Sequence, residues 1–293
     1  AKRIAEEIEA GVDGVIVTHG TDTMHYTSAA LSFMLRDLPV PVMLVGSQRS
    51  SDRGSSDSTM NLICAARFIE KSDFAGVAIC MHGSSSDEFC FIHDNTNVRK
   101  MHTSRRDAFR SIDVTPFGKI HADGEIEWLR KDYVKKEITR QINLDAVFDK
   151  KIALIKAYPG FDHTELEFYE KQNYKGLVIE SMALGHLPNR ATDQYTKHHE
   201  KMNTIIEKMT KKGMIIVLAS QCPYGRVNLN VYSPQRRLLD AGVIPVRMTS
   251  ETAFVKLGWA LGQTKEPEKV KEIMMTNFVG EIVERIDPDA FLY

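Results

Sequence analysis

Short apolar runs that alternate with amphipathic helical segments constrain the fold of this chain more than any other feature of its sequence. Val15–Val17, Val42–Val45 and Gly76–Met81 are such runs, and a helical pattern follows each of the first two. Strands that are apolar on both faces and alternate with helices are typical of a parallel sheet covered on both sides. The alternation restarts after Lys151. The pattern therefore predicts an α/β fold.

The alternation divides the chain into two predicted domains, which suits a length of 293 residues. Residues 1–128 are expected to form a larger domain with a doubly wound, mostly parallel sheet, with an antiparallel edge where Glu88–His93 folds back as a hairpin. Residues 151–293 are expected to form a smaller α/β domain, joined by a charged linker at 129–150. Helices are predicted at 1–10, 23–35, 58–70, 163–170, 195–212, 234–241, 251–261 and 268–275, and further strands at 152–155, 177–179 and 214–218.

Composition excludes several classes of protein. The 38 Lys and Arg residues nearly balance 39 Asp and Glu residues, so no global basic field favours nucleic acids. The longest apolar run, Met214–Ala219, has six residues, far fewer than the roughly 18 of a membrane-spanning helix. The four cysteines form no CxxC pair, which argues against a disulfide framework and predicts buried thiols in a reducing compartment. Together with the lack of a signal peptide, these features predict a soluble, cytoplasmic protein.

Neither GxGxxG nor GxxxxGK[ST] occurs in the sequence, so we expect this chain to bind neither NAD nor ATP, nor any other cofactor or metal. His198 and His199 lack a carboxylate at the spacing of a zinc site. Gly185–Asn189 follows a predicted strand and is consistent with a turn or with a lining of the domain interface.

Polar segments that follow parallel strands are the first candidates for a ligand site, because crevices lie at the carboxyl ends of such strands. Thr18–Thr23 follows the first strand, and its Gly20 would let the backbone turn tightly while Thr21 and Asp22 place a hydroxyl and a carboxylate side by side. The alternative is helix capping, for which Thr and Asp are preferred residues.

Two further polar segments leave both a functional and a structural interpretation open. Gly46–Arg53 follows the second strand and is suited to holding a small zwitterion or to crossing the surface as a loop. Asn97–Arg110 contains five Lys or Arg residues, so it is either a solvated basic face or the source of an inward-facing lysine that assists a neighbouring hydroxyl. Spacing alone does not select which lysine.

These segments together resemble the L-asparaginase/glutaminase family. The resemblance rests on the HGTDT motif at His19–Thr23 after a Val-Ile-Val strand, on Val45–Arg49, and on the lysine of Val98–Lys100, and it runs from about Ala1 to Met275. Within that family, Val98–Ser111 is most similar to the D-type subunit of the archaeal glutamyl-tRNA(Gln) amidotransferases.

The resemblance implies an asparaginase-like fold and a set of site residues. Thr21, Asp22 and Lys100 would form the hydrogen-bonded catalytic triad, with Gly20, Asp22, Ser47, Gln48 and Tyr232 as substrate-binding residues and no metal. Tyr232 stands where the secreted asparaginases place an acidic residue from the neighbouring subunit, which argues against the secreted type.

In the family, a separate nucleophilic threonine lies in a Thr-Gly-Gly-Thr-Ile segment on the first strand, and this chain contains no Gly-Gly dipeptide. We therefore expect the nucleophile and its strand to be absent from these residues, as in a piece of a longer chain. A Thr hydroxyl is a poor nucleophile at its ordinary pKa and needs a nearby cation and proton acceptor, which the triad would supply.

The function implied is release of ammonia from Gln or Asn through a Thr-based acyl-enzyme. A homodimer would supply this ammonia to the E-type subunit of the amidotransferase, a partner that uses ATP and Mg to convert Glu-tRNA(Gln) to Gln-tRNA(Gln). The alternative is an autonomous cytosolic L-asparaginase with the same catalytic residues.

Overall fold

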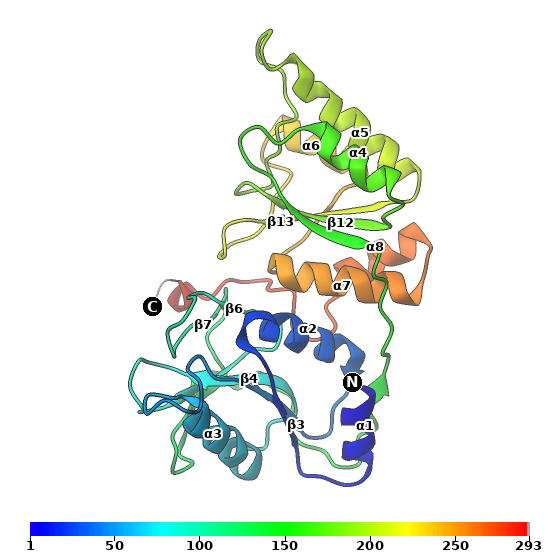
Figure 1. The fold of residues 1–293 in the computed structure, drawn as a ribbon. Helices are drawn as coiled ribbons and strands as arrows, with labels where there is room; N and C mark the ends of the chain where they lie inside the picture. The colour runs from blue at the N-terminus through cyan, green and yellow to red at the C-terminus, as the bar shows by residue number, and fades with distance from the viewer. Residues whose placement is uncertain (292–293) are drawn as a thin grey trace. The chain divides into compact units, whose positions relative to one another are not determined.

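The computed structural model describes residues 1–291 and divides into two compact units (Figure 1). Unit 1 comprises Ala1–Ala146 together with the C-terminal residues from Arg285 onward, and unit 2 comprises Val147–Glu284. The predicted α/β class is confirmed. Within residues 1–291, no helix is both long enough and apolar enough to cross a membrane.

Unit 1 is built on a mixed sheet in the order β1-β3-β4-β5-β8-β9. The first three strands are parallel, and β5, β8 and β9 continue the sheet in antiparallel pairing, so the predicted hairpin edge is confirmed. The strand bounds are Val15–Thr18 (β1), Pro41–Val45 (β3), Gly76–His82 (β4), Cys90–His93 (β5), Gly118–Ile120 (β8) and Ile126–Trp128 (β9).

Alternation of side chains along β3 and β4 explains why both faces of this sheet are apolar. Val42, Leu44 and Ile79 belong to one buried cluster with α1 and α2, whereas Met43 and Ala78 belong to another with α3. Figure 1 shows α2 and α3 on opposite faces of the sheet. The helices span Lys2–Glu9 (α1), Met24–Met34 (α2) and Ser58–Lys71 (α3), and a 3₁₀ turn, η1 (Thr21–Thr23), precedes α2.

Two small antiparallel pairs complete unit 1. A second hairpin pairs β6 (Val98–Lys100) with β7 (Phe109–Ser111), and β2 (Leu35–Arg36) pairs with β10 (Asn143–Leu144). A further 3₁₀ turn, η3 (Pro288–Ala290), follows Asp287, whose backbone N–H donates to Asp113 O at 3.0 Å.

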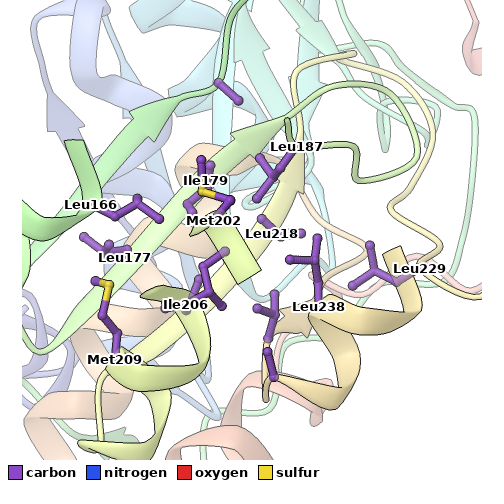
Figure 2. Close-up of a cluster of buried hydrophobic side chains, with 14 of the residues drawn as sticks. Leu166, Leu177, Ile179, Leu187, Met202, Ile206, Met209, Leu218, Leu229 and Leu238 are labelled. Carbon is purple, nitrogen blue, oxygen red and sulfur yellow. The ribbon is translucent and has the colours of Figure 1, made fainter. Parts of the chain in front are cut away.

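Unit 2 contains a parallel sheet in the order β11-β12-β13-β14. One buried cluster joins Leu177, Ile179 and Leu218 of the sheet to α4, α5 and α6, as Figure 2 shows for Leu166, Met202, Ile206 and Leu238. A second cluster covers the other face with α7 and α8. The bounds are Ile152–Lys156 (β11), His163–Lys171 (α4), Gly176–Ser181 (β12), Lys197–His199 (η2), Glu200–Lys211 (α5), Ile215–Ser220 (β13), Ser233–Asp240 (α6), Ile244–Pro245 (β14), Ser250–Gln263 (α7) and Pro267–Met275 (α8).

The predicted elements recur in the structure with boundaries shifted by a few residues. Gly11 follows the first helix, as predicted, and its φ of +95° is the left-handed conformation that a glycine after a helix commonly adopts. Cys64, Cys80 and Cys90 are buried thiols, as expected for three of the four cysteines.

The domain limits differ from the sequence-based ones. Much of the segment predicted as a linker at 129–150 is attached to unit 1 by backbone hydrogen bonds, since Ala75 N donates to Val134 O and Lys136 N donates to Asp73 O. The residues from Arg285 onward, expected in the second domain, belong to unit 1. Backbone pairing of this kind leaves no periodic pattern in a charged sequence.

Candidate active site

Thr21, Asp22 and Lys100 lie together in unit 1, although Thr21 and Lys100 are 79 positions apart in the sequence. Lys100, the last residue of β6, donates from Nζ to Thr21 Oγ1 at 2.9 Å and to Asp22 Oδ1 at 2.6 Å. Thr21 is buried, Lys100 is 11% exposed and the Asp22 side chain is 91% exposed. The arrangement therefore sets one largely buried ammonium between a buried hydroxyl and an open carboxylate.

The capping interpretation of Thr21 and Asp22 does not describe this arrangement. Gly20 and Thr23 occupy the N-cap positions of η1 and α2, and in the described part of the chain neither helix start has a side-chain cap hydrogen bond. The hydroxyl and the carboxylate point to Lys100 instead.

Electrostatics around Lys100 fix two protonation states. The hydrogen bond and positive charge of Lys100 lower the pKa of Asp22, so this carboxyl is ionised at neutral pH. Burial, together with the charges of Arg99 and Lys100, lowers the pKa of His25 to about 4, so its imidazole is neutral beside the site.

Three of the other basic residues in the Asn97–Arg110 segment are held by carboxylates. Asp107, which is buried, accepts from Arg105 at 2.9 and 2.8 Å and from Arg110 at 3.0 Å. Arg106 donates to Asp87 at 2.6 Å. The tip of the β6–β7 hairpin is thus fixed beside Lys100, and the basic stretch is not simply a solvated face.

The Gly46–Arg49 loop lies against Thr21. His19 N donates to Val45 O at 2.8 Å, and the Thr21 hydroxyl faces Gln48 Oε1 at 3.5 Å. A Cβ on Gly46 would lie 2.7 Å from His19 O and 2.9 Å from Thr21 Cγ2, so the two segments meet closely only because residue 46 is glycine.

Gly20 does not have the role that its position in the sequence indicated. Its φ of −64° and ψ of 137° are extended values that any residue adopts, and a Cβ there would meet nothing within 4 Å. The turn is fixed by His19, whose Nδ1 lies 2.6 Å from Gly20 O and whose Nε2 lies 2.9 Å from Thr27 Oγ1.

The loop is held from behind by Asp57, which the sequence pattern did not single out. This buried carboxylate accepts from Ser47 Oγ at 2.9 Å and from the backbone N–H groups of Gln48 and Arg49 at 3.0 Å. Arg49 O also lies close to Ser47 Oγ and competes for the same proton, so the Ser47 hydroxyl is engaged within the loop. A role for Ser47 in binding substrate remains a prediction.

The remaining candidates lie in unit 2. Tyr232 precedes α6, is half exposed, and has its ring centroid 5.2 Å from that of His186 in the Gly185–Asn189 segment. The rings of His198 and His199 pack against each other at 4.4 Å. Among residues 1–291, no group of three His, Cys, Asp or Glu side chains is placed to hold a metal ion.

Comparison with known proteins decides the family. Residues 1–133 match the family of asparaginase N-terminal domains, and residues 151–274 match the glutaminase/asparaginase C-terminal domain. The thermostable L-asparaginase from Thermococcus kodakarensis superimposes with a TM-score of 0.84 and 31% identity, over 96% of this chain and 79% of that one. This chain belongs to the asparaginase family.

Other relatives refine this placement within the asparaginase family. L-asparaginase I from Vibrio cholerae has a TM-score of 0.80 and 28% identity, over 96% of this chain and 80% of that one. The D-type subunit of glutamyl-tRNA(Gln) amidotransferase from Thermococcus kodakarensis is 52% identical over the whole of this chain, and that from Pyrococcus horikoshii is 49% identical. The chain spans 64% of the length of these two relatives. The resemblance found in the sequence, including that to the D-type subunit, is confirmed.

Proposed function

We propose that these residues form the amide-hydrolysing part of a tRNA-dependent amidotransferase subunit. In this proposal the subunit releases ammonia from Gln or Asn, and a partner of the E type uses ATP and Mg to convert Glu-tRNA(Gln) to Gln-tRNA(Gln). The observation that carries the proposal is the placement of Lys100 Nζ within hydrogen-bond distance of both Thr21 and Asp22. The 52% identity to a D-type amidotransferase subunit supports the choice of reaction.

Each residue of the triad has a distinct proposed role. Lys100 stabilises the negative charge that develops on Thr21 Oγ1 as this hydroxyl gives up its own proton, which lets the oxygen accept the proton of an attacking hydroxyl. Attack on the side-chain amide carbon forms an ester, and the proton that Thr21 gives up passes to the departing amide nitrogen, which leaves as ammonia. Water then hydrolyses the ester to the acid. Asp22, which is open and ionised, binds the α-ammonium of the amino-acid substrate.

The attacking hydroxyl is proposed to come from a threonine outside residues 1–293. Among the described residues, the Thr21 hydroxyl faces only the distant oxygen of Gln48 as an acceptor. Within residues 1–291, β1 pairs with β3 on one side alone, and its Val15–Val17 are only partly buried although all three are apolar. A further strand along this edge would bury them and bring its own residues close to Thr21.

Ammonia release by the full-length protein tests the triad. Lys100→Met and Thr21→Val should each lower kcat for Gln or Asn about 100-fold or more, because the first removes the charged stabiliser and the second removes the oxygen that accepts the proton. Lys119→Met, which breaks an exposed pair with Glu127, is the matched control and should retain full activity. Wild-type activity in Lys100→Met would refute the proposal.

Partner dependence tests the reaction assigned. Ammonia release should rise when the partner subunit and Glu-tRNA(Gln) are added. Strong hydrolysis of Asn that is indifferent to both additions would favour the autonomous asparaginase instead. Sedimentation of the full-length protein tests the proposed homodimer.

A further inference from the structure

A continuous chain of polar side chains, buried over most of its length, runs behind the candidate site, and the roles proposed above for Thr21, Asp22 and Lys100 do not use it. It passes from Asp57 to Asn61 on α3, then to His82 at the end of β4, and on to Asp87 and Arg106. Asp57, Asn61 and His82 are fully buried, while the Asp87 side chain is 66% exposed. The chain therefore connects the back of the Gly46–Arg49 loop with the protein surface.

The orientation of the Asn61 amide is set by its neighbours. Two acceptors, Gly46 O at 3.0 Å and Asp57 Oδ2 at 3.1 Å, lie beside one end of the amide, which must be the NH₂ group. The other end is then the carbonyl Oδ1, which lies 2.6 Å from His82 Nδ1 and accepts from Cys90 Sγ at 3.3 Å. His82 Nδ1 must therefore carry a proton.

The second ring nitrogen of His82 faces an acceptor as well. Nε2 lies 2.9 Å from Asp87 Oδ1. The hydrogen bond with His82 and the charge of Arg106 lower the pKa of Asp87, so this carboxyl is ionised at neutral pH and only accepts. With a proton on each nitrogen, His82 is an imidazolium.

We propose that His82 is a positioning residue that acts as a buried imidazolium, holding the Asn61 amide and, through it, the Gly46–Arg49 loop against Thr21. The proposal rests on the proposed function, because the loop matters through the geometry it gives Thr21. Asn61 Nδ2 fixes Gly46 O, and Gly46 in turn lies against His19 O and Thr21 Cγ2. If His82 lost a proton, one unprotonated ring nitrogen would face the oxygen of Asn61 or of Asp87. Rotation of the Asn61 amide would relieve that repulsion at the cost of its hydrogen bonds to Gly46 O and Asp57 Oδ2.

Among the residues that the structure describes, few charged groups face His82. Asp87 comes from the loop after β4, Arg106 reaches Asp87 from the β6–β7 hairpin, and Asp57, just before α3, contributes through Asn61. Cys90 on β5 and Cys64 on α3 are buried near them, and the hydrogen bond between these thiols, with burial, raises the pKa of Cys64 far above neutrality. Asp87 is therefore the carboxylate that directly offsets the imidazolium.

The pH dependence of ammonia release by the full-length protein tests the proposal with a surface variant that leaves the core intact. Asp87→Asn should move the alkaline loss of kcat/KM to lower pH by about one unit, because a neutral amide offsets the imidazolium less than a carboxylate does. The matched control is Asp132→Asn, an exposed carboxylate near Arg130, which should leave the profile unchanged. An Asp87→Asn profile that superimposes on the wild type would overturn the inference.

Substitutions of His82 separate positioning from mere filling of space. His82→Phe should lower kcat about 100-fold with a smaller change in KM, the cost of a misplaced reacting group. His82→Asn, whose amide can still donate to Asn61 Oδ1, should restore activity to within about tenfold of wild type. The alkaline loss of activity should disappear, since an amide does not titrate.

His93→Phe, at an equally buried histidine of β5 bonded to Ser111, is the control and should leave the pH profile unchanged. Equal kcat/KM in His82→Phe and wild type would contradict the role.

A direct readout keeps this inference distinct from the proposed function. Solid-state ¹⁵N NMR of the full-length protein labelled at histidine should show one buried ring with both nitrogens protonated at neutral pH, and that signal should vanish in His82→Asn. A neutral ring would overturn the inference even if Lys100→Met abolished activity. Full activity in Lys100→Met would instead overturn the function and leave the NMR result standing.

Discussion

Loss of the buried ammonium of Lys256 is predicted to destabilise unit 2 strongly. Lys256, on α7, donates from Nζ to Glu281 Oε1 at 2.5 Å, to Thr276 O at 2.5 Å and to Met274 O at 3.2 Å. Both charged side chains are completely buried. Lys256→Met would leave the Glu281 carboxylate buried beside the backbone N–H groups of Phe278 and Val279, and two carbonyls would lose a donor.

The expected cost follows from these contacts. Breaking a buried ion pair on one side costs about 3–5 kcal/mol, because an uncompensated charge remains. Since the carboxylate keeps backbone donors, we expect about 3 kcal/mol, or a fall of roughly 10 °C in the melting temperature of a domain of this size. Glu281→Gln should cost only about 1–2 kcal/mol, since the ammonium keeps its carbonyl acceptors.

Differential scanning calorimetry of the full-length protein measures these shifts, and hydrogen exchange of α7 peptides identifies the transition that belongs to unit 2. Lys265→Met, which removes the exposed partner of Asp149, is the control and should cost under about 1 kcal/mol. Combining Lys256→Met with Glu281→Leu should recover about 2 kcal/mol, because no buried charge is then left alone. A double variant no more stable than Lys256→Met, or a Lys256→Met variant that melts within about 2 °C of wild type, would refute the role of the buried ion pair.

Two further predictions concern unit 1. Gly46→Ala should lower kcat/KM at least about tenfold, because the new methyl group would press on the backbone oxygen of His19 and displace the loop. Gly54→Ala, where nothing lies within 4 Å, should leave ammonia release unchanged, and equal activity in the two variants would count against the close-approach argument. Burial lowers the pKa of His25 to about 4 and of His93 to about 3, so the unfolded chain binds more protons than the folded one below pH about 6.5. Stability should therefore be fully present above that pH and fall as pH is lowered, by about 3 kcal/mol through each histidine on reaching pH 4. Melting temperatures between about pH 4 and 7.5 check this, and a flat profile would show that the two rings are not held neutral.

The parallel strands were predictable because burial on both faces leaves a continuous apolar run. Val42–Val45 and Met214–Ala219 have this character, and both correspond to central strands. The short strands β6, β7, β8 and β9 were missed, since three residues carry too little pattern to reveal a pairing partner. Their place depends on contacts between residues distant in the chain.

The candidate site was predictable in its residue types and not in its geometry. Thr21 and Asp22 stand out after a strand, but Lys100 is one of five basic residues in its segment. The structure distinguishes it because Asp107 holds Arg105 and Arg110, and Asp87 holds Arg106, while Lys100 reaches Thr21. Both carboxylates lie near these arginines in space, and only the fold reveals which cation each one engages.

The polar chain behind the site left one signal in the sequence that could have been followed. Cys64, Ala65 and Phe68 form the buried stripe of α3, and Asn61 and Asp57 continue that stripe toward the start of the helix with polar residues. Apolar residues of similar size would continue the buried face of the helix equally well. Replacing buried polar groups with apolar ones often leaves the stability of the fold unchanged or raises it. Stability alone therefore does not account for an amide and a carboxylate there. Their hydrogen bonds instead hold Gly46, Gln48 and Arg49, in the loop that faces Thr21. Sequences are expected to depart from the local pattern at sites where the placement of a group matters more than the stability of the fold.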